Sequence, residues 1–281
     1  MRMVGLDMLD LRIFKSVMCF TMVVLTFTPV AAQDWEKAST AYESGDFAKA
    51  VEELRPLVEA NDATSALAAN LLGRLYEAGD GVPKDYAQAI SYYQLAAEKG
   101  LDVGQHNLGV MYDKVLQNYE EAVKWYRLAA EQNNAESQYN LGSMYLNGLG
   151  VVQDSKEAVS WLRLAAGQGL AAAQSNLGIL YQEGNGVLQN YEESVGWFRL
   201  AAVQGNAIAQ SNLGVVYEYG EGVLQDNVMA HMWYNIASAN GHKKSVGYRD
   251  ERTEVMTSAD ISKAQTMARE CMSSEYEKCG Y

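Results

Sequence analysis

The sequence contains few of the side chains from which metal sites and catalytic centres are built. Its 281 residues include three histidines and three cysteines. The histidines, at His106, His231 and His242, do not pair at metal-ligand spacing, and no cysteine or carboxylate cluster completes a zinc site. The motifs Ser-x-x-Lys, Lys-Thr-Gly and Gly-x-Ser-x-Gly, which mark serine acyl-enzymes, are also missing. We therefore expect no catalytic residue, no bound metal and no cofactor.

Cysteine is missing from the whole middle of the chain. Cys19 lies in the leader described below, which leaves Cys271 and Cys279 near the C-terminus. In an oxidising compartment these two thiols can close a small terminal loop, or they can stay free in a frayed tail, and the sequence does not choose. In either case the middle of the chain must be held together by packing alone.

Positive charge is scarce as well. Lys and Arg number 22 against 35 Asp and Glu, which gives a formal net charge of −13 at pH 7. A surface of this sign repels phosphate backbones and anionic lipids. Nucleic acid is therefore not an expected partner, whereas a basic or neutral protein is compatible with the charge.

The N-terminus has too short an apolar run for a membrane-spanning helix. The uncharged stretch Ser16–Val30 has 15 residues, against about 20 for a helix that crosses a bilayer. Basic residues precede it, and Val30-Ala31-Ala32 follows it. This order is typical of a secretory signal, and we predict cleavage after Ala32.

Removal of residues 1–32 has three consequences. The leader carries three basic and two acidic residues, so the mature chain has a formal charge of −14. We expect a periplasmic or secreted protein with no stable membrane insertion after cleavage. Asp7 and Asp10 are unusual in a basic leader, so translation from Met8 is an alternative to translation from Met1.

The most informative feature is a repeat between Ser65 and Gly241. Four copies contain Gln-x-Asn-Leu-Gly, and a degenerate first copy reads Asn-Leu-Leu-Gly. The glycines are spaced 36, 33, 36 and 36 residues apart, at Gly73, Gly109, Gly142, Gly178 and Gly214. A Tyr follows each of them three residues later. Self-similarity at this period predicts a solenoid, in which each unit buries its apolar face against its neighbours.

Each copy is expected to form two helices. In the third copy Gln138, Leu141, Gly142 and Tyr145 fall on one helical stripe. Gly148 and Gly150 then end that helix and allow a tight return, and a second helix starts near Asp154. The second copy is three residues shorter and has no Gly-x-Gly, so its turn must be tighter.

Two residue types are expected to hold the helices together. The second helices share a large aromatic residue, Trp in four copies, which we expect to be the main packing anchor between neighbouring pairs. The recurring Asn is a poor helix former unless its amide is used. We expect it to hydrogen-bond the first helix to an adjacent loop, at Asn107, Asn140, Asn176 and Asn212.

The chain on either side of the repeats is expected to cap the stack. Residues 33–64 predict a further helix pair, with Ala50, Val51, Leu54 and Leu57 on the buried face. Residues 242–281 predict two closing helices and a tail. A capping box, Thr257-Ser258-Ala259-Asp260, begins the second of these helices.

The repeat unit closely resembles the Sel1-like repeat, a relative of the tetratricopeptide helix pair. The shared parts are Asn-Leu-Gly-x-x-Tyr, the Gly-x-Gly-Val turn, the Ala-x-x-Trp helix and an Ala-Ala pair. The resemblance implies an all-α fold, a right-handed α/α superhelical solenoid. It covers five repeats, which we place at residues 65–100, 101–133, 134–169, 170–205 and 206–241, and the segment 33–64 looks tetratricopeptide-like.

The resemblance also implies a role. Proteins of this type act as adaptors in the bacterial periplasm, so we expect a non-catalytic scaffold that binds another protein. One alternative is a secreted host-interaction or virulence factor. A second is a weak hydrolase acting on β-lactams or peptidoglycan. Relatives with that activity carry disulfide-linked helix pairs, and no repeat here contains a cysteine.

In tetratricopeptide-like solenoids the first helices line the concave face, and a partner would bind there. The stripe beside the packing residues varies between copies and includes several apolar side chains, which we expect to be exposed. Its members are Asn70, Arg74, Glu77, His106, Val110, Asp113, Tyr139, Ser143, Leu146, Ser175, Ile179, Gln182, Ser211, Val215 and Glu218. We predict that a peptide or helix of a partner protein contacts this stripe.

Overall fold

The computed structural model describes residues 29–60, 62 and 64–280, and every regular element in this part of the chain is a helix. The chain divides into two compact units, Met1–Lys99 and Gly100–Tyr281, called here the N-terminal and the C-terminal unit. Most of the predicted leader, residues 1–28, lies outside the described residues. The predicted cleavage site after Ala32 falls within the first described helix.

The described part of the N-terminal unit, from residue 29 onwards, contains two helix pairs. They are α2 (Pro29–Glu43), α3 (Phe47–Glu59), α4 (Ser65–Ala78) and α5 (Tyr86–Glu98). The predicted buried face of α3 is confirmed, because Ala50, Val51, Leu54 and Leu57 are all buried. They pack with Leu72 and Leu75 of α4 in one apolar cluster.

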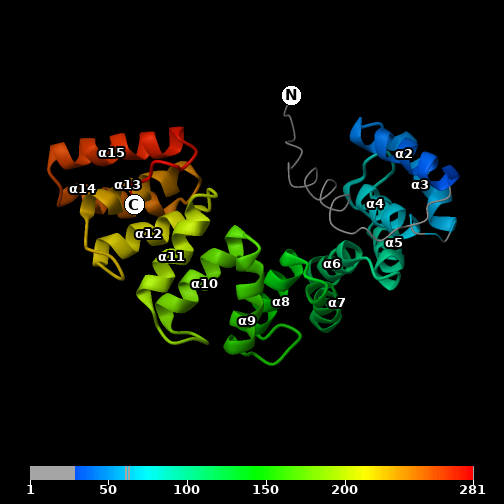
Figure 1. The fold of residues 1–281 in the computed structure, drawn as a ribbon, viewed down its shortest axis with the longest axis horizontal. Helices are drawn as coiled ribbons and strands as arrows, with labels where there is room; N and C mark the ends of the chain where they lie inside the picture. The colour runs from blue at the N-terminus through cyan, green and yellow to red at the C-terminus, as the bar shows by residue number, and fades with distance from the viewer. Residues whose placement is uncertain (1–28, 61, 63, 281) are drawn as a thin grey trace. The chain divides into compact units, whose positions relative to one another are not determined.

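The C-terminal unit continues with four further pairs and a pair of closing helices (Figure 1). Its helices are α6 (Asp102–Val110), α7 (Tyr119–Glu131), α8 (Ala135–Asn147), α9 (Ser155–Gly167), α10 (Ala171–Glu183), α11 (Tyr191–Ala202), α12 (Ala207–Tyr219), α13 (Asn227–Ala239), α14 (Lys244–Glu254) and α15 (Ser258–Ser273). Each pair packs on the next, with contacts of α7 to α8, α9 to α10 and α11 to α12. The predicted all-helical solenoid is confirmed.

Asp or Asn side chains start the second helices. Asp154 accepts hydrogen bonds from the amides of Lys156 and Glu157, at 2.9 and 3.1 Å, and so satisfies two backbone donors at the start of α9. Asp85 and Asp226 cap their helices with two such bonds, and Asn118 and Asn190 cap theirs with one. The second helix of every repeat therefore begins at a residue that the sequence repeats.

The glycines between the paired helices act as predicted. Gly148 ends α8 in a left-handed conformation, with φ of +65°. Gly150 also has a positive φ, and a Cβ there would collide with the carbonyl oxygen of Tyr119 at the start of the preceding second helix. This second glycine thus lets the turn of one repeat lie directly against the repeat before it.

The short second repeat replaces this turn with a different device. After α6 the chain continues as a π-helical segment, Met111–Val115, and Gln117 then adopts a positive φ of 52°. Asn118 follows at once as the N-cap of α7. The expected tighter turn is confirmed, and the π-helical segment supplies it.

The predicted tryptophans are not the most deeply buried residues of the second helices. Trp125, Trp161 and Trp197 are half-buried, whereas the residue after each of them is fully buried. These fully buried residues are Tyr93, Tyr126, Leu162, Phe198 and Tyr234. Each lies against the landmark glycine of its own first helix, where a Cβ would collide with it. The glycine therefore makes room for a large side chain inside its own repeat.

Trp161 and Trp197 pack against the repeat before their own, as predicted. Trp161 contacts the apolar cluster of Tyr126 and Leu141, and its indole N–H donates to Glu157 at 2.9 Å. Trp233 departs from this pattern, because it is fully buried in the last repeat. It belongs to the largest apolar cluster of the C-terminal unit, which the closing helices cover.

Glutamine, not asparagine, makes the recurring hydrogen bonds of the motif. Gln138 donates to the carbonyl of Ala130 at 3.1 Å and accepts from Gln168 at 2.8 Å, so it joins the ends of two successive second helices, α7 and α9. Gln174 and Gln210 make the same two kinds of bond. The expectation for Asn140, Asn176 and Asn212 is wrong. Among the described residues no side-chain hydrogen bond ties them to a loop. These asparagines are half-buried, whereas the glutamines of the motif are buried between the helices.

The closing helices form as expected. Helices α14 and α15 both pack on α13, and Thr257 caps α15 by accepting from the amide of Asp260 at 3.2 Å. A disulfide joins Cys271 to Cys279, which the sequence left open. Both cysteines are buried in the apolar cluster of this end, and Tyr276 between them accepts a hydrogen bond from Asn240 at 2.8 Å.

Candidate interaction surface

The predicted partner stripe lies on the first helices, but it is less accessible than expected. Five members are buried, namely Asn70, Asp113, Ser175, Ser211 and Glu218. The other ten are half-buried: Arg74, Glu77, His106, Val110, Tyr139, Ser143, Leu146, Ile179, Gln182 and Val215. The expected exposure of the apolar members is wrong. Tyr139 and Leu146, for example, pack against the apolar cluster of the next pair.

The reason is that neighbouring first helices in the C-terminal unit contact each other. A hydrogen bond of 2.8 Å joins His106 Nδ1 on α6 to Ser137 Oγ on α8. Gln182 on α10 donates to Glu221, just beyond α12, at 2.7 Å. One side of α6 therefore forms a seam with α8, and one side of α10 forms a seam with α12 and the turn after it.

His106 lies in this seam in an environment that favours its neutral form. Burial lowers the pKa of His106 from 6.5 to about 4, against a smaller opposing effect of Asp102. The neutral imidazole suits the hydrogen bond to Ser137. We assign His106 a structural role between α6 and α8.

In three repeats the last position of the stripe triplet pairs with the buried residue of the second helix. The hydroxyl of Tyr93 donates to Glu77 at 2.6 Å in the N-terminal unit. In the C-terminal unit Tyr234 donates to Glu218 at 2.7 Å, and Tyr126 is 3.4 Å from Asp113. Burial, aided by these carboxylates, raises the pKa of all three tyrosines well above 10.

The other two repeats lack the hydroxyl and also lack the acid. Leu162 and Phe198 are the buried second-helix residues there, and the stripe positions are Leu146 and Gln182. This position varies between copies, as the sequence shows. The structure shows that the residue matches the hydrogen-bonding capacity of its packing partner. These positions therefore belong to the fold.

The part of the stripe that stays partly open runs along α6, α8, α10 and α12. It consists of Val110, Tyr139, Ser143, Ile179 and Val215, all half-buried, and we call it the first-helix row. Ser175 lies beside it, and among the described residues its buried hydroxyl has no hydrogen-bond partner. Four of its members are apolar, and the fifth, Ser143, is small and polar.

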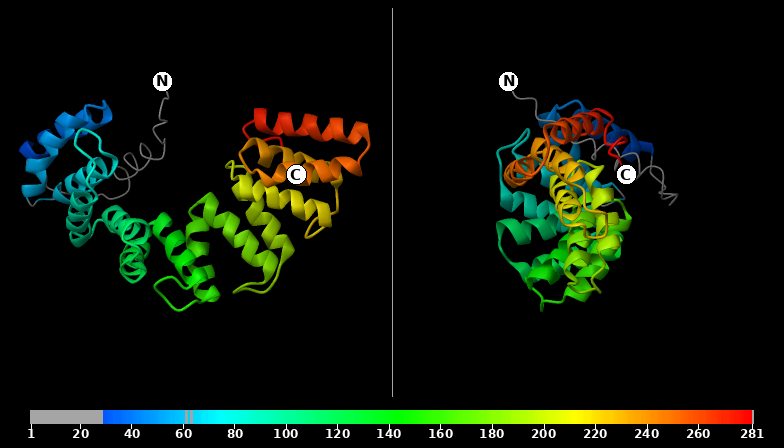
Figure 2. Two further views of the ribbon diagram at one scale, coloured as in Figure 1. Left: turned by 180° about the vertical axis from the view of Figure 1, so that it is seen from behind. Right: turned by 90° about the vertical axis from the view of Figure 1, so that its left-hand side faces the viewer.

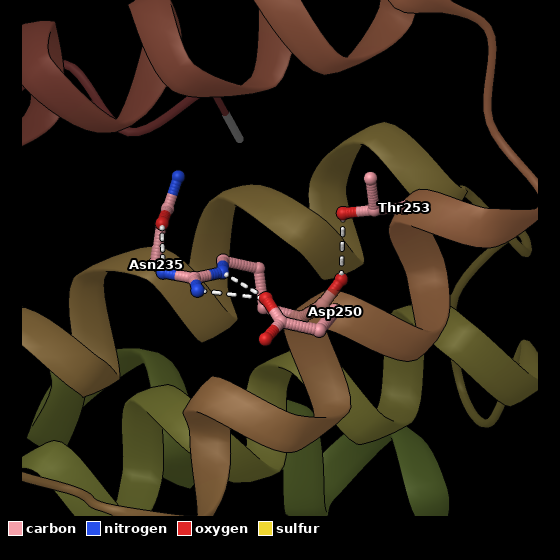
Figure 3. A network of polar contacts seen from close by, with 4 residues as sticks. Asn235, Asp250 and Thr253 are labelled. Atoms are coloured by element: carbon pink, nitrogen blue, oxygen red, sulfur yellow. Dashed lines mark hydrogen bonds and ion pairs between the residues drawn. The ribbon is translucent and has the colours of Figure 1, made fainter.

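A small pocket of about 320 Å³ lies between α13, α14 and α15. Arg249 in its wall donates to Asp250 at 2.7 and 2.9 Å and to Asn235 at 3.4 Å. Figure 3 shows this network, in which Thr253 also takes part by donating to the carbonyl of Arg249 at 3.1 Å. The arginine is held by its neighbours, so the network serves to fix α14 on α13.

The remaining titratable groups do not converge. Within residues 29–60, 62 and 64–280, no group of three or more His, Cys, Asp or Glu side chains has the geometry to hold a metal ion. His231 is buried in α13, and burial together with the charge of Arg249 lowers its pKa. It is a core histidine of the C-terminal unit.

None of the described helices combines the length and the apolar character needed to cross a lipid bilayer.

The repeats match a known family. The Sel1 repeat model matches residues 66–101, 103–134, 135–170, 171–206 and 207–242. No functionally curated protein matches the chain. Proteins with Sel1 repeats generally mediate protein–protein interactions, on a scaffold that is generally non-catalytic.

Solved structures of similar proteins have the same fold. One is c5321, a protective antigen of uropathogenic Escherichia coli, at 30% identity and a TM-score of 0.81 over 88% of this chain. The chain spans only 55% of the length of that antigen. Another is a Sel1 repeat protein from Oxalobacter formigenes, at 32% identity and a TM-score of 0.71, covering 77% of this chain and 86% of the other. The chain therefore belongs to the Sel1 repeat family.

Proposed function

We propose that this protein is an exported adaptor that binds a partner protein along the first-helix row and carries out no chemistry. The observation that carries the proposal is the row itself. Partly open apolar residues recur on α6, α8, α10 and α12, four successive first helices of one Sel1 array. A solenoid presents such positions as one extended surface, which suits a helix or an extended segment of another protein.

The rigidity of the row supports this role. Tyr139 and Ile179 are each packed on one side against an apolar cluster of the C-terminal unit. Their side chains are therefore held in place before a partner arrives, which lowers the entropy cost of binding. Asn70, Arg74 and Glu77 are the corresponding residues of α4 in the N-terminal unit, where Arg74 lies over the ring of Tyr42 at 5.9 Å.

Photo-crosslinking tests the binding surface. Tyr139 would be replaced by a photoreactive phenylalanine analogue, which is also aromatic and keeps most of its packing. The matched control carries the same analogue at Leu164, a second-helix residue that is 51% exposed. We expect one protein to be crosslinked from Tyr139 and not from Leu164. The same products from both positions, or none from Tyr139, would contradict the proposal.

Export is proposed from the N-terminal leader. The mature protein should begin at Gln33, which N-terminal sequencing of protein from the native host would show. Val24→Arg places a charge in the apolar part of the leader and should block processing. A full-length chain that starts at Met1 or Met8 in both forms would refute cleavage.

A second candidate is a role outside the cell, in contact with a host. The similarity to a protective antigen of uropathogenic Escherichia coli favours it. Fractionation separates the two candidates, because an adaptor of the periplasm stays in the cell envelope and a host-facing factor appears in the culture medium or on the cell surface. Either location leaves the binding surface the same.

The proposal also includes the absence of catalysis. The purified mature chain should hydrolyse a chromogenic β-lactam and labelled peptidoglycan no faster than buffer alone. Hydrolysis that purifies with the folded chain would restore the hydrolase alternative.

A further inference from the structure

Three loops of the C-terminal unit present an aliphatic side chain almost fully to solvent. Val152, Leu188 and Leu224 are 88%, 90% and 90% exposed. They lie in the loops α8–α9, α10–α11 and α12–α13, at intervals of 36 residues. Single exposed aliphatic residues are normal on protein surfaces. The same exposed position in three successive repeats is not a scattered single residue.

The loops hold these side chains outward. The residue before each exposed one is a valine that is partly buried against the core, for example Val187 and Val223. The residue after it is a glutamine whose side chain donates back to the end of the first helix. Gln153, Gln189 and Gln225 bond the carbonyls of Leu146, Gln182 and Glu218 at 2.7, 2.8 and 2.8 Å.

The backbone fixes the loops further. The amides of Asp154, Asn190 and Asp226 donate to the carbonyls of Tyr145, Tyr181 and Tyr217 at 3.0, 2.9 and 2.9 Å. Each loop is thus closed by a side-chain bond and a backbone bond. An exposed aliphatic residue on a rigid loop loses little entropy when a partner covers it.

The fold does not require an aliphatic residue at this position. The corresponding residue of the α4–α5 loop in the N-terminal unit is Pro83, which is exposed. The short second repeat has no Gly-x-Gly loop, and its equivalent residue, Leu116, is only 50% exposed. An almost fully exposed aliphatic residue at this position is therefore found in three neighbouring repeats of the C-terminal unit.

Charge around the loops selects the kind of partner. The segments 147–157, 183–193 and 219–229 contain seven acidic residues and one basic residue. The acidic residues are Asp154, Glu157, Glu183, Glu192, Glu193, Glu221 and Asp226. Such a border attracts a partner that carries positive charge beside its apolar residues, and it repels a second copy of the same edge.

The three loops lie along the same edge of the C-terminal unit in both broad views (Figures 1 and 2). We propose that Val152, Leu188 and Leu224, called here the loop ladder, bind a basic amphipathic helix of a partner protein. The apolar face of that helix would cover the three aliphatic side chains, and its lysines or arginines would face the carboxylates on either side. This surface is distinct from the first-helix row, and it stands if the proposed function of that row fails.

The test uses the mature chain and a synthetic probe. The probe is an 18-residue helix with leucines on one face and lysines on the other, and its partner peptide carries glutamate in place of every lysine. The ladder variant is Val152→Gln, Leu188→Gln and Leu224→Gln. The matched control is Leu128→Gln, Leu164→Gln and Leu200→Gln, which removes three leucines of the same period that are 45%, 51% and 49% exposed.

Fluorescence anisotropy at physiological salt measures the binding of each peptide. We expect the lysine peptide to bind the wild type and the control alike, and the ladder variant at least about tenfold more weakly. The glutamate peptide should not bind. A Ser143→Arg variant, altered in the first-helix row, should bind the lysine peptide like the wild type.

Three results would overturn the proposal. The first is no binding of the lysine peptide to the wild type, or equal binding to the ladder variant. The second is equal binding of the glutamate peptide, because the contact would then be only apolar adhesion. The third is self-association of the wild type that the ladder variant loses in sedimentation, because a second copy would then be the occupant. Melting curves of both variants within about 2 °C of the wild type show that folding is unchanged.

Discussion

The pairing of a buried tyrosine with a carboxylate gives the sharpest prediction about the fold. Tyr234 is fully buried in α13, and its hydroxyl donates to Glu218 of α12 at 2.7 Å. Glu218 is only 8% exposed and also pairs with Arg252 at 3.1 Å. Tyr234→Phe removes the hydroxyl and leaves the ring, so packing is kept and only the hydrogen bond is lost.

The expected cost follows from the charge of the acceptor. A hydrogen bond to a charged group contributes about 1.5–3 kcal/mol, and the loss is largest when the remaining partner is buried. Arg252 still pairs with Glu218 in the variant, so we expect the lower half of this range. For a protein of this size each kcal/mol lowers the melting temperature by about 2–4 °C, which predicts a decrease of roughly 3–9 °C.

A double-mutant cycle isolates the pair. Glu218→Gln with Tyr234→Phe reproduces the Gln182 and Phe198 combination that the fourth repeat already has. We expect the double variant to be less destabilised than the sum of the two single variants, by about 1 kcal/mol or more. The assay is thermal and urea unfolding of the mature chain followed by circular dichroism.

The control is Tyr86→Phe, which removes the hydroxyl of a tyrosine that is 41% exposed. It should leave the melting temperature unchanged. A Tyr234→Phe variant as stable as the wild type would refute the reasoning, and so would single effects that simply add. Either result would mean that the acid and the tyrosine are neighbours without energetic coupling.

Three further predictions follow from the same packing. Leu162→Ala should cost about 2–5 kcal/mol of unfolding free energy. Trp161→Ala should cost less, about 1–3 kcal/mol, because Leu162 is fully buried and Trp161 is half-buried. If urea unfolding ranks the two variants in the opposite order, Leu162 is not the main packing residue of α9. Gly150→Ala should destabilise by more than about 1 kcal/mol, since its φ is +68° and a Cβ would meet Tyr119; an unchanged melting curve would show that the turn relaxes freely. The pKa of His106 is lowered to about 4, so its contribution to stability is complete above about pH 6.5 and is lost as the pH falls towards 4, by at most about 3 kcal/mol. The free energy of unfolding, measured from pH 7 to 4, should fall less steeply with pH in His106→Gln than in the wild type. An equal fall in both would exclude His106 as the cause.

The repeats were predictable from the sequence because their physical signals are local. Spacing of Gly142 and its equivalents gives the period, and Gly148 marks the end of a helix whatever surrounds it. Asp154 before an apolar helical stripe marks the next start. These signals depend on backbone conformation within a few residues, so one sequence suffices to locate the helix pairs.

Contacts between helices were harder to predict. Trp161 and Leu162 are adjacent and both apolar, and a rotation of 100° per residue decides which one faces the glycine. Gln138 and Asn140 are both amides on one helix, yet only the glutamine reaches the ends of two second helices. The signal for the Tyr234–Glu218 pair was present, since acids occur where the second helix has Tyr and not where it has Leu or Phe. It becomes visible only once the two positions are known to touch.

The exposure of the predicted partner stripe could not be predicted from the sequence either. The residues Glu77, Leu146 and Gln182 differ between copies because each matches the buried second-helix residue that it contacts, and the sequence alone does not show that contact. The exposed Val152 and Leu188 were passed over, because a sequence does not show which residue of a tight loop points outward. Exposure depends on the hydrogen bonds of Gln153 and Gln189, which only the folded loop displays.

The most direct test of the central claim is binding in a purified system. Titration calorimetry would measure the mature chain against the protein captured by crosslinking from Tyr139. We predict saturable binding that Ser143→Arg, in the first-helix row, weakens at least about tenfold, and that Leu164→Gln on the second-helix face leaves unchanged. Absence of binding, or equal weakening by both substitutions, would contradict a role as an adaptor that works through its first helices.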